Sequence, residues 1–403
     1  MKEKIKTELQ LLWNTQAQSQ NGKRKLYLDF ARSIAIILVV AGHSTFTNPY
    51  IHVLISTFHL PAFFVISGWL MQDKQEEKLP FKTIFLRKIR SIFIPYVMFS
   101  FLTLLLDVLH ILRGHFTWKL LIEHTLQTIL LLGYSVMWFL PVLLLTELLV
   151  ILLLKVIHHL PFKKMTMLLI LYAFILISAH TAYYGYIAYG EHISLLGYQT
   201  YSDYASSFAN FDYSNMTLQK FLIQESRILI KVLIASFFMI TGYIAGTIIT
   251  KKENSEEQPF AKHFCFRPME LILGLLLISV NIFASFRIQV FDLNFLNLGS
   301  ISFYFILGTT GTLGLLLICR NLPNIALLTF FGQNSLIIMC THLSFYILYI
   351  GQLSSFYLAG FLPGDDISVI AILSIILTMF YEIFVILIIR IFFPFVLGKK
   401  NSK

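Results

Sequence analysis

Three residues with chemically useful side chains interrupt an apolar run at residues 28–44, LDFARSIAIILVVAGHS: Asp29, Arg32 and His43. An imidazole is the side chain best suited to accept a proton from a hydroxyl group near neutral pH. A guanidinium suits phosphate or carboxylate groups. The sequence therefore predicts proton transfer and anion binding along one apolar segment.

The spacing of these residues places them on one face of a helix. The step from Arg32 to His43 turns a helix by three circles plus about 20°, and Asp29 lies about 60° from Arg32. Arg32 and His43 would stand ~16 Å apart, about half of the hydrocarbon thickness. A central Arg costs about 2.5–3.5 kcal/mol on insertion scales, so such residues usually face a bundle interior or a wet cavity. The structural alternative is that Asp29 and Arg32 only neutralise each other while His43 lies at the interface.

Polar residues in the next apolar segments add candidates. Ser56 and Ser67 are eleven residues apart and share a helix face. His59 could share a proton pathway with His43, or only form a hydrogen bond between helices. The basic residues Arg87, Lys88 and Arg90 could bind phosphates, or only anchor the chain at a membrane surface.

Later segments contain further polar residues. Asp107 could pair with His110, and Glu147 could orient a histidine or bind sugar hydroxyls. Ser335 and His342 are seven residues apart and share a helix face. For each of these residues, hydrogen bonding between helices is the alternative.

The composition indicates which class of fold must position these residues. The 403 residues are 57% hydrophobic and 13% charged, and the mean hydropathy is +0.74. A soluble domain has about twice that charged fraction. The net charge of +10 could indicate nucleic-acid binding, but the positive residues cluster in short segments between apolar runs, as in cytoplasmic loops of membrane proteins. We predict an all-α, polytopic integral membrane bundle whose partners include the bilayer but no nucleic acid.

About ten apolar segments could cross a bilayer. They lie near residues 26–45, 51–71, 92–112, 135–156, 166–186, 228–250, 269–286, 298–319, 324–350 and 367–391. With this topology most Lys and Arg residues fall inside and both termini are cytoplasmic. Residues 113–134 are long enough to span but polar, and 187–226 should form an outer loop. The predicted organisation is a basic N-terminal segment (1–25), a membrane domain (26–398) and a tail (399–403).

The three cysteines suggest neither disulfides nor metal. Cys319 and Cys340 lie in or beside apolar segments, and Cys265 lies in a basic segment. No CxxC or Cys/His spacing is present, so no metal site is expected.

Motifs in most of the chain resemble those of the acyltransferase 3 family. Asp29-Phe30-Ala31-Arg32 with Gly42-His43 is similar to its opening motif, an Arg separated by ten residues from a His. The run FHLPAFFVISGWLM at 58–71 resembles its second-helix signature. Arg87 and Arg90 followed by Pro95-Tyr96 resemble the family's basic loop and the Pro-Tyr after it. Trp138-Phe139-Leu140 resembles its W-F-L element, and Gly332-Gln333-Asn334-Ser335 with His342 resembles its late G-x-N-S…H element. The sugar O-acetyltransferase branch, including fucose O-acetylase-like proteins, is the most similar.

This resemblance implies transfer of an acyl group from cytoplasmic acyl-CoA to a hydroxyl of an envelope glycan or lipid-linked sugar. Acetyl is the expected group, with succinyl or another short acyl group as alternatives. His43 would be the general base or a transient acyl carrier, and Arg32 would hold the donor. Donor or acceptor binding is expected from Asp29, His59, Ser67, Arg87, Arg90, Trp138, Glu147, Ser335 and His342. Acyl-CoA would be a substrate, so no bound cofactor is expected, and the location would be a bacterial plasma or inner membrane.

Two other classes of protein could use the same residues. A transporter or flippase would also place Arg, His and Glu inside a bundle, but the sequence lacks an internal repeat and matching Gly/Pro-broken helices. A membrane protein could also bind a glycan without chemistry. Labelled acetyl transfer that depends on His43 would distinguish the three.

Overall fold

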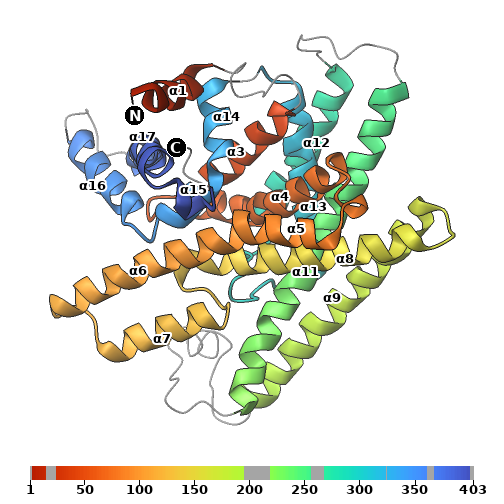
Figure 1. Cartoon of the computed structure of the whole chain (residues 1–403), viewed down its shortest axis with the longest axis horizontal. Coiled ribbons are helices and arrows are strands. Elements are labelled where there is room, and N and C mark those ends of the chain that lie inside the picture. Colours follow the sequence, from red (N-terminus) through yellow and green to blue (C-terminus); the bar gives the residue numbers. More distant parts are fainter. Residues whose placement is uncertain are drawn as a thin grey trace.

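The computed structural model describes residues 2–14, 24–194, 218–255, 267–323, 325–360 and 367–399. In these ranges the chain is a helical bundle (Figure 1), and its one β contact is an isolated bridge between Asp292 and Asn297. Nine helical stretches are long and apolar enough to cross a membrane. The predicted polytopic all-α bundle is therefore confirmed.

The long helices agree with the predicted segments, with extensions before the third span and from both sides into the predicted outer loop 187–226. They are α3 (Leu26–Gly42), α4 (Pro49–Asp73), α6 (Ile94–Leu112), α8 (Phe139–His159), α9 (Lys164–Ser194), α11 (Leu218–Ser255), α12 (Pro268–Ser285), α13 (Ile301–Arg320) and α17 (Ile367–Phe392). Helix α6 continues from α5 (Phe81–Lys88) through the π-helical turn η2 (Ile89–Phe93). The expected basic loop before the third span is thus helical from Phe81 onward. Pro95 cannot donate a hydrogen bond to the carbonyl of Ser91, which explains the wider turn here.

Helix α4 lies at the centre of the bundle because small residues allow close packing. A Cβ atom at Gly68 would meet the backbone of Met239 on α11, and one at Gly242 would meet the backbone of Val65. Close approach through small residues is the usual way in which membrane helices associate. These contacts fix the face of α4 that packs against α11.

The predicted ninth span, 324–350, is interrupted. It forms α14 (Ala326–Gln333) and α15 (Ser335–Thr341), and α16 (Ile347–Ala359) follows after a turn. At the first break the Asn334 side chain donates to the Phe330 carbonyl at 2.8 Å, a local bond that competes with regular helix. At the second break Tyr346 has a left-handed φ of 61°. The apolar composition of this segment does not reveal either break.

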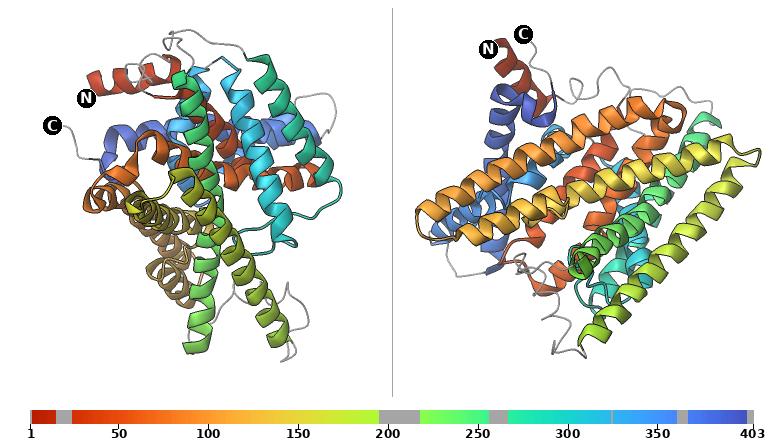
Figure 2. Two further views of the ribbon diagram at one scale, coloured as in Figure 1. Left: turned by 90° about the vertical axis from the view of Figure 1, so that its right-hand side faces the viewer. Right: turned by 60° about the horizontal axis from the view of Figure 1, so that its bottom comes forward.

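The ambiguous segment 113–134 does not span. It contains α7 (Trp118–Ile129), about 18 Å long, which lies alongside α6 (Figure 2). His124 Nδ1 lies 2.8 Å from Asp107 Oδ2 and fastens α7 to α6. The predicted pairing of Asp107 with His110 is therefore wrong, because His110 instead contacts the Tyr346 hydroxyl at 3.0 Å.

Helix α1 (Lys2–Trp13) and the C-terminal end of α17 lie on one side of the bundle (Figures 1 and 2). Glu8 on α1 forms an ion pair with Arg390 on α17 at 2.6 Å. We call this side the terminus face; α3 begins there and ends with His43 toward the opposite face. Termini on one side require an even number of crossings, and the interrupted α14–α16 segment is the part of the described chain that can supply the tenth.

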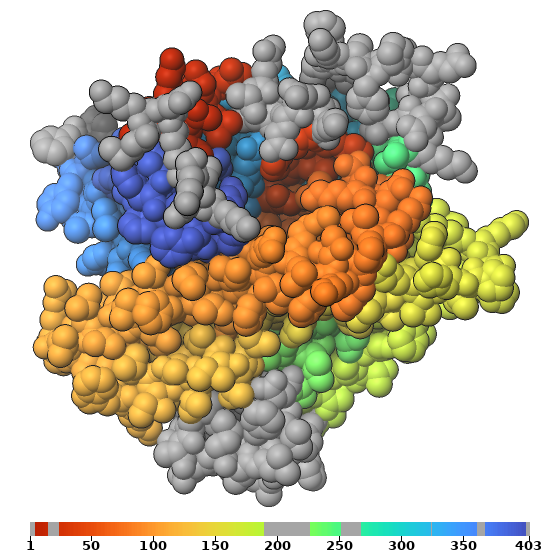
Figure 3. Space-filling model, viewed as in Figure 1, coloured from red at the N-terminus to blue at the C-terminus, as the bar shows by residue number. Residues whose placement is uncertain are grey.

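Four predicted features lie wholly or partly outside the described residues. They are the basic N-terminal segment 1–25, described at 2–14 and from 24; the outer loop at 187–226, described only to residue 194 and from 218; the basic loop that contains Cys265; and the tail beyond residue 399. In the space-filling view, α5 and α6 form a band in front of the bundle with α7 below α6, and α3 shows only in part behind α5 (Figure 3).

Candidate active site

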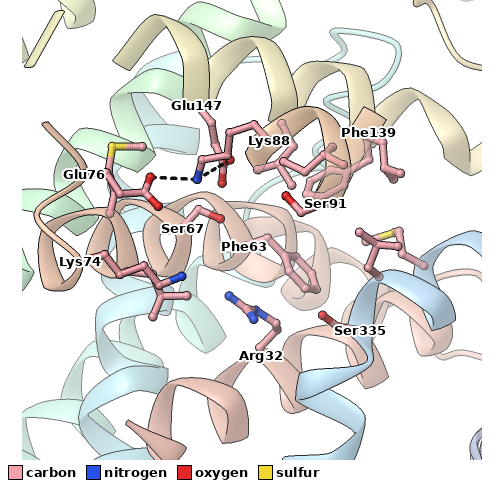
Figure 4. A pocket seen from close by; sticks show the side chains of 17 residues that line it. Arg32, Phe63, Ser67, Lys74, Glu76, Lys88, Ser91, Phe139, Glu147 and Ser335 are labelled. Atoms are coloured by element: carbon pink, nitrogen blue, oxygen red, sulfur yellow. Dashed lines mark ion pairs between the residues drawn. The ribbon is translucent and has the colours of Figure 1, made fainter. Parts of the chain in front are cut away.

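A cavity of about 260 Å³ lies around Arg32, and we call it the arginine cavity. Its polar lining comes from four parts of the chain: Arg32 on α3, Ser67 on α4 with Lys74 and Glu76 just after it, Lys88 and Ser91 before α6, and Glu147 on α8. Ser335 of α15 completes it (Figure 4). The predicted residues Arg32, Ser67, Glu147 and Ser335 therefore share one cavity.

An ion-pair network forms one wall of the arginine cavity. Lys88 Nζ lies 2.9 Å from Glu76 Oε2 and 3.0 Å from Glu147 Oε2 (Figure 4). Burial of such charges is tolerated when they are paired. Glu147 therefore pairs with Lys88, and the predicted use of Glu147 to orient a histidine is not what the structure shows.

Arg32 lies across the cavity from this network (Figure 4). Its nearest carboxylate is Asp29 at 3.9 Å, and its guanidinium makes no hydrogen bond within the described ranges. Lys74 also points into the cavity, and burial lowers the pKa of Lys74 although Glu76 opposes this effect. Three cations, Arg32, Lys74 and Lys88, face two carboxylates, so the lining carries an excess positive charge that suits an anionic ligand.

Asp29 does not line this cavity. Its carboxylate accepts two hydrogen bonds from Arg24, at 2.5 and 2.9 Å. The predicted stripe is therefore split, because Asp29 is neutralised mainly by Arg24. The backbone of Asp29 packs closely against α14, because a Cβ atom at Gly332 would meet the Asp29 carbonyl.

A second cavity, of about 370 Å³, lies around His43 toward the opposite face, and we call it the histidine cavity. It is lined by His43, His52, Ser56, His59 and Trp138, and by residues 290–295 between α12 and α13. His59 Nδ1 lies 2.7 Å from the Ile55 carbonyl and must donate to it. His342 lies just behind the lining, with its ring centroid 5.3 Å from that of His43. The two predicted histidines, His59 and His342, thus both lie near His43.

Phe139 and Met339 are the two residues that line both cavities. Trp138 lines only the histidine cavity and Leu140 only the arginine cavity, so the W-F-L element crosses the boundary between them. Segment α15 does the same, since Ser335 lines the arginine cavity and Met339 lines both. The cavities are therefore arranged in series along α3.

A basic groove of about 480 Å³ adjoins the arginine cavity at the terminus face. It is lined by Arg87, Arg90 and Lys399, and it shares Ser91 with the arginine cavity. Arg87 also lies 3.4 Å from Glu76 Oε1. The groove joins the beginning of α6 to the end of the chain, a juxtaposition that no local pattern predicts.

Sequence reasoning assigned no role in the site to several of the lining residues, although it named Phe139 as part of the W-F-L element. They include Lys74, Glu76, Phe139, Met339, Asp292 and Asn294. Lys74 and Glu76 belong to a charged segment in which no spacing distinguishes buried from solvated residues. Asp292 and Asn294 could have been identified as candidates because they are polar residues in the short segment between two predicted spans.

Comparison with curated proteins and with solved structures returns no match. The model of the acyltransferase 3 family, described as an acyltransferase domain, matches residues 25–398. That match covers all three cavities except Lys399 and agrees with the nine long apolar helices. The chain therefore belongs to the acyltransferase 3 family and is a multi-pass membrane acyltransferase.

Proposed function

We propose that this protein transfers an acetyl group from cytoplasmic acetyl-CoA to a sugar hydroxyl of an envelope or exported polysaccharide, or of its lipid-linked precursor, in a bacterial plasma or inner membrane. The serial arrangement of the arginine and histidine cavities carries this proposal. Their positions, one toward the terminus face and one toward the opposite face, suit a donor and an acceptor that arrive from different sides of a membrane. The shared wall of Phe139 and Met339 would be the place where the acyl group passes.

The donor is assigned to the terminus face. The positive-inside rule makes this face cytoplasmic, because basic residues such as Arg24, Lys25 and Arg87 gather there. Coenzyme A has several phosphate groups, and the basic groove offers charge-assisted hydrogen bonds to them. The acyl-pantetheine arm would then extend through the arginine cavity, where Arg32 has donors available for a carbonyl or phosphate oxygen.

The acceptor is assigned to the histidine cavity. The acceptor oxygen would bond to the thioester carbonyl carbon while its proton passes to His43, and the C–S bond would break. The leaving thiolate of coenzyme A would then take up a proton. Transfer through an acyl group carried transiently on His43 would use the same residues in two steps.

Labelled acetyl transfer tests this function. Membranes that contain the wild-type chain should incorporate acetyl from acetyl-CoA into the glycan fraction, and His43→Ala should lower the rate by about 10²- to 10⁴-fold. His158→Ala is a matched control because His158 lines none of the three cavities. An unchanged rate in His43→Ala would exclude both roles of His43. Glycan transport without any need for acetyl-CoA would instead favour the flippase class.

A further inference from the structure

The segment between α12 and α13 is a fixed loop at the histidine cavity. Asp292 and Asn297 exchange two backbone hydrogen bonds, at 2.8 and 2.9 Å. The Phe295 N–H donates to Asp292 Oδ1 at 3.0 Å. Leu293, Leu296 and Leu298 are each at most 1% exposed and anchor the loop in the core.

Side chains of three helices form hydrogen bonds with this loop. Ser56 Oγ on α4 accepts from the Phe291 N–H at 3.1 Å, and the Tyr183 hydroxyl on α9 accepts from the Leu298 N–H at 3.2 Å. Lys231 Nζ on α11 donates to Asn294 Oδ1 at 3.0 Å. Because side chains of three helices bind it, the loop has a fixed conformation and forms one wall of the histidine cavity.

Lys231 has an unusual position for a lysine. It lies within a candidate span and is 5% exposed. Its ammonium group lies 4.6 Å from the centre of the Trp138 ring while it donates to Asn294. Ionisable residues inside membrane helices are costly and usually functional. Lys231 joins two walls of the histidine cavity, Trp138 and the loop, and fixes their relative position.

A carboxylate, an amide and an indole ring of the loop and of Trp138 face the histidine cavity. Asp292 Oδ2 and the Asn294 amide nitrogen have no hydrogen-bond partner within the described ranges, and both residues line the cavity with Trp138 and His43. A carboxylate and an amide can accept from and donate to hydroxyl groups. An indole ring offers an apolar face beside them. A ligand with several hydroxyl groups and an apolar face, such as a pyranose, matches this set.

We propose that Asp292, Asn294 and Trp138 form the sugar subsite of the acceptor, and that Lys231 is the positioning residue that holds this subsite beside His43. The inference rests on the proposed function, because it identifies the outer ligand as the sugar that is acylated. Asp292 accepts hydrogen bonds from sugar hydroxyls, and Trp138 packs against the ring of the sugar.

Binding without acyl-CoA tests the subsite separately from catalysis. The purified full-length protein in detergent is titrated with a panel of methyl glycosides (glucoside, galactoside, rhamnoside, fucoside and N-acetylglucosaminide) while thermal unfolding is recorded. At least one glycoside should stabilise the wild-type protein. Asp292→Asn, which keeps the size of the side chain, should weaken that binding by about tenfold or more, as expected for loss of a hydrogen bond to a charged group.

Control variants separate a binding role from a structural one. Glu123→Gln removes a carboxylate that lines none of the three cavities and should leave glycoside binding unchanged. Lys231→Arg, which keeps the charge, should retain more binding than Lys231→Met. The proposal is overturned if no glycoside stabilises the wild-type protein, or if Asp292→Asn binds as the wild type does. A wild-type protein that binds glycosides but transfers no acetyl group would contradict the proposed function and leave the sugar subsite supported.

Discussion

The rings of His43 and His342 lie 5.3 Å apart between centroids, tilted by 39°. His43 ends α3 at the histidine cavity, whereas His342 follows α15 and is fully buried. His342 Nδ1 lies 2.7 Å from the Ile338 carbonyl, so Nδ1 is protonated and Nε2 is the acceptor of the neutral ring. That Nε2 atom has no hydrogen-bond partner within the described ranges. A free buried acceptor next to the proposed base can take part in its proton transfers.

We expect His342→Gln to lower kcat for acetyl transfer by roughly tenfold or more, because the variant loses a proton acceptor beside His43. The KM for acetyl-CoA should stay unchanged, since His342 does not line the arginine cavity or the basic groove. Initial rates over a range of acetyl-CoA concentrations separate the two constants, and thermal unfolding confirms that the fold is intact. A folded variant with wild-type kcat would exclude a role in proton transfer.

The wall of Phe139 and Met339 should control passage of the acyl group. Met339→Trp should lower acetyl transfer at least tenfold by filling the boundary between the cavities. Met339→Ala should raise the use of butyryl-CoA relative to acetyl-CoA by roughly tenfold, a typical value for a buried methylene group in a specificity pocket. Leu343→Ala is the matched control, because Leu343 lines only the histidine cavity. Equal acyl-chain preference in the two alanine variants would argue against the wall.

The basic groove should bind the phosphates of the donor. Arg87→Gln and Arg90→Gln should each raise the KM for acetyl-CoA by about tenfold, equivalent to loss of a contact of about 1.4 kcal/mol. S-acetyl-pantetheine lacks the nucleotide and its phosphates, so its KM should change little. Lys82→Gln on α5 serves as the control because Lys82 does not line the groove. If both donors respond equally to Arg90→Gln, the groove does not bind phosphate.

The 3-10 turn η1 (Glu76–Lys78), whose residue Glu76 lines the arginine cavity, should give the protein an acid-sensitive element. Burial alone would raise the pKa of Glu77, but Lys164 at 3.0 Å, together with the Tyr243 hydroxyl and a backbone N–H, outweighs burial, so the pKa lies below its ordinary value. The unfolded chain then binds the proton more readily, and the stabilisation is lost as pH falls through the folded-state pKa. Glu77→Gln should cost about 1 kcal/mol at neutral pH, a modest value because Lys164 is 46% exposed and screened by solvent.

Thermal unfolding measured from neutral to acidic pH checks this expectation. Glu77→Gln and Lys164→Met should both flatten the loss of stability on acidification. A variant that keeps the wild-type slope would show that the ion pair does not contribute to the acid response.

The spans of this fold are predictable because they depend on local composition. Apolar runs of sufficient length locate the nine long helices to within a few residues at most of their ends. The ninth predicted span fails because a side-chain amide at Asn334 competes with the helix, and composition does not report that competition. The start of α5 at Phe81 was missed because its basic residues suggested a loop.

The candidate site could be predicted only in part, because local patterns identify residues on one helix but not contacts between helices. Arg32 and His43 share a helix, so their periodicity alone places them on one face. Asp29 satisfies the same periodicity, yet its partner is Arg24, from the segment before the helix. Phe139 and Met339 meet across the bundle and come from residues that look like ordinary packing side chains. Such contacts depend on the tertiary arrangement, and a single sequence contains no signal for them.

The ion pair between Glu8 and Arg390 has a consequence for how the bundle is assembled. The two residues are 382 positions apart, so the first helix of the described chain emerges from the ribosome long before its partner exists. Helix α1 also packs against α14, which is made before α17, but the ion pair itself can form only after the last long helix has been made. Formation of the Glu8–Arg390 ion pair is therefore a late event in the assembly of the bundle.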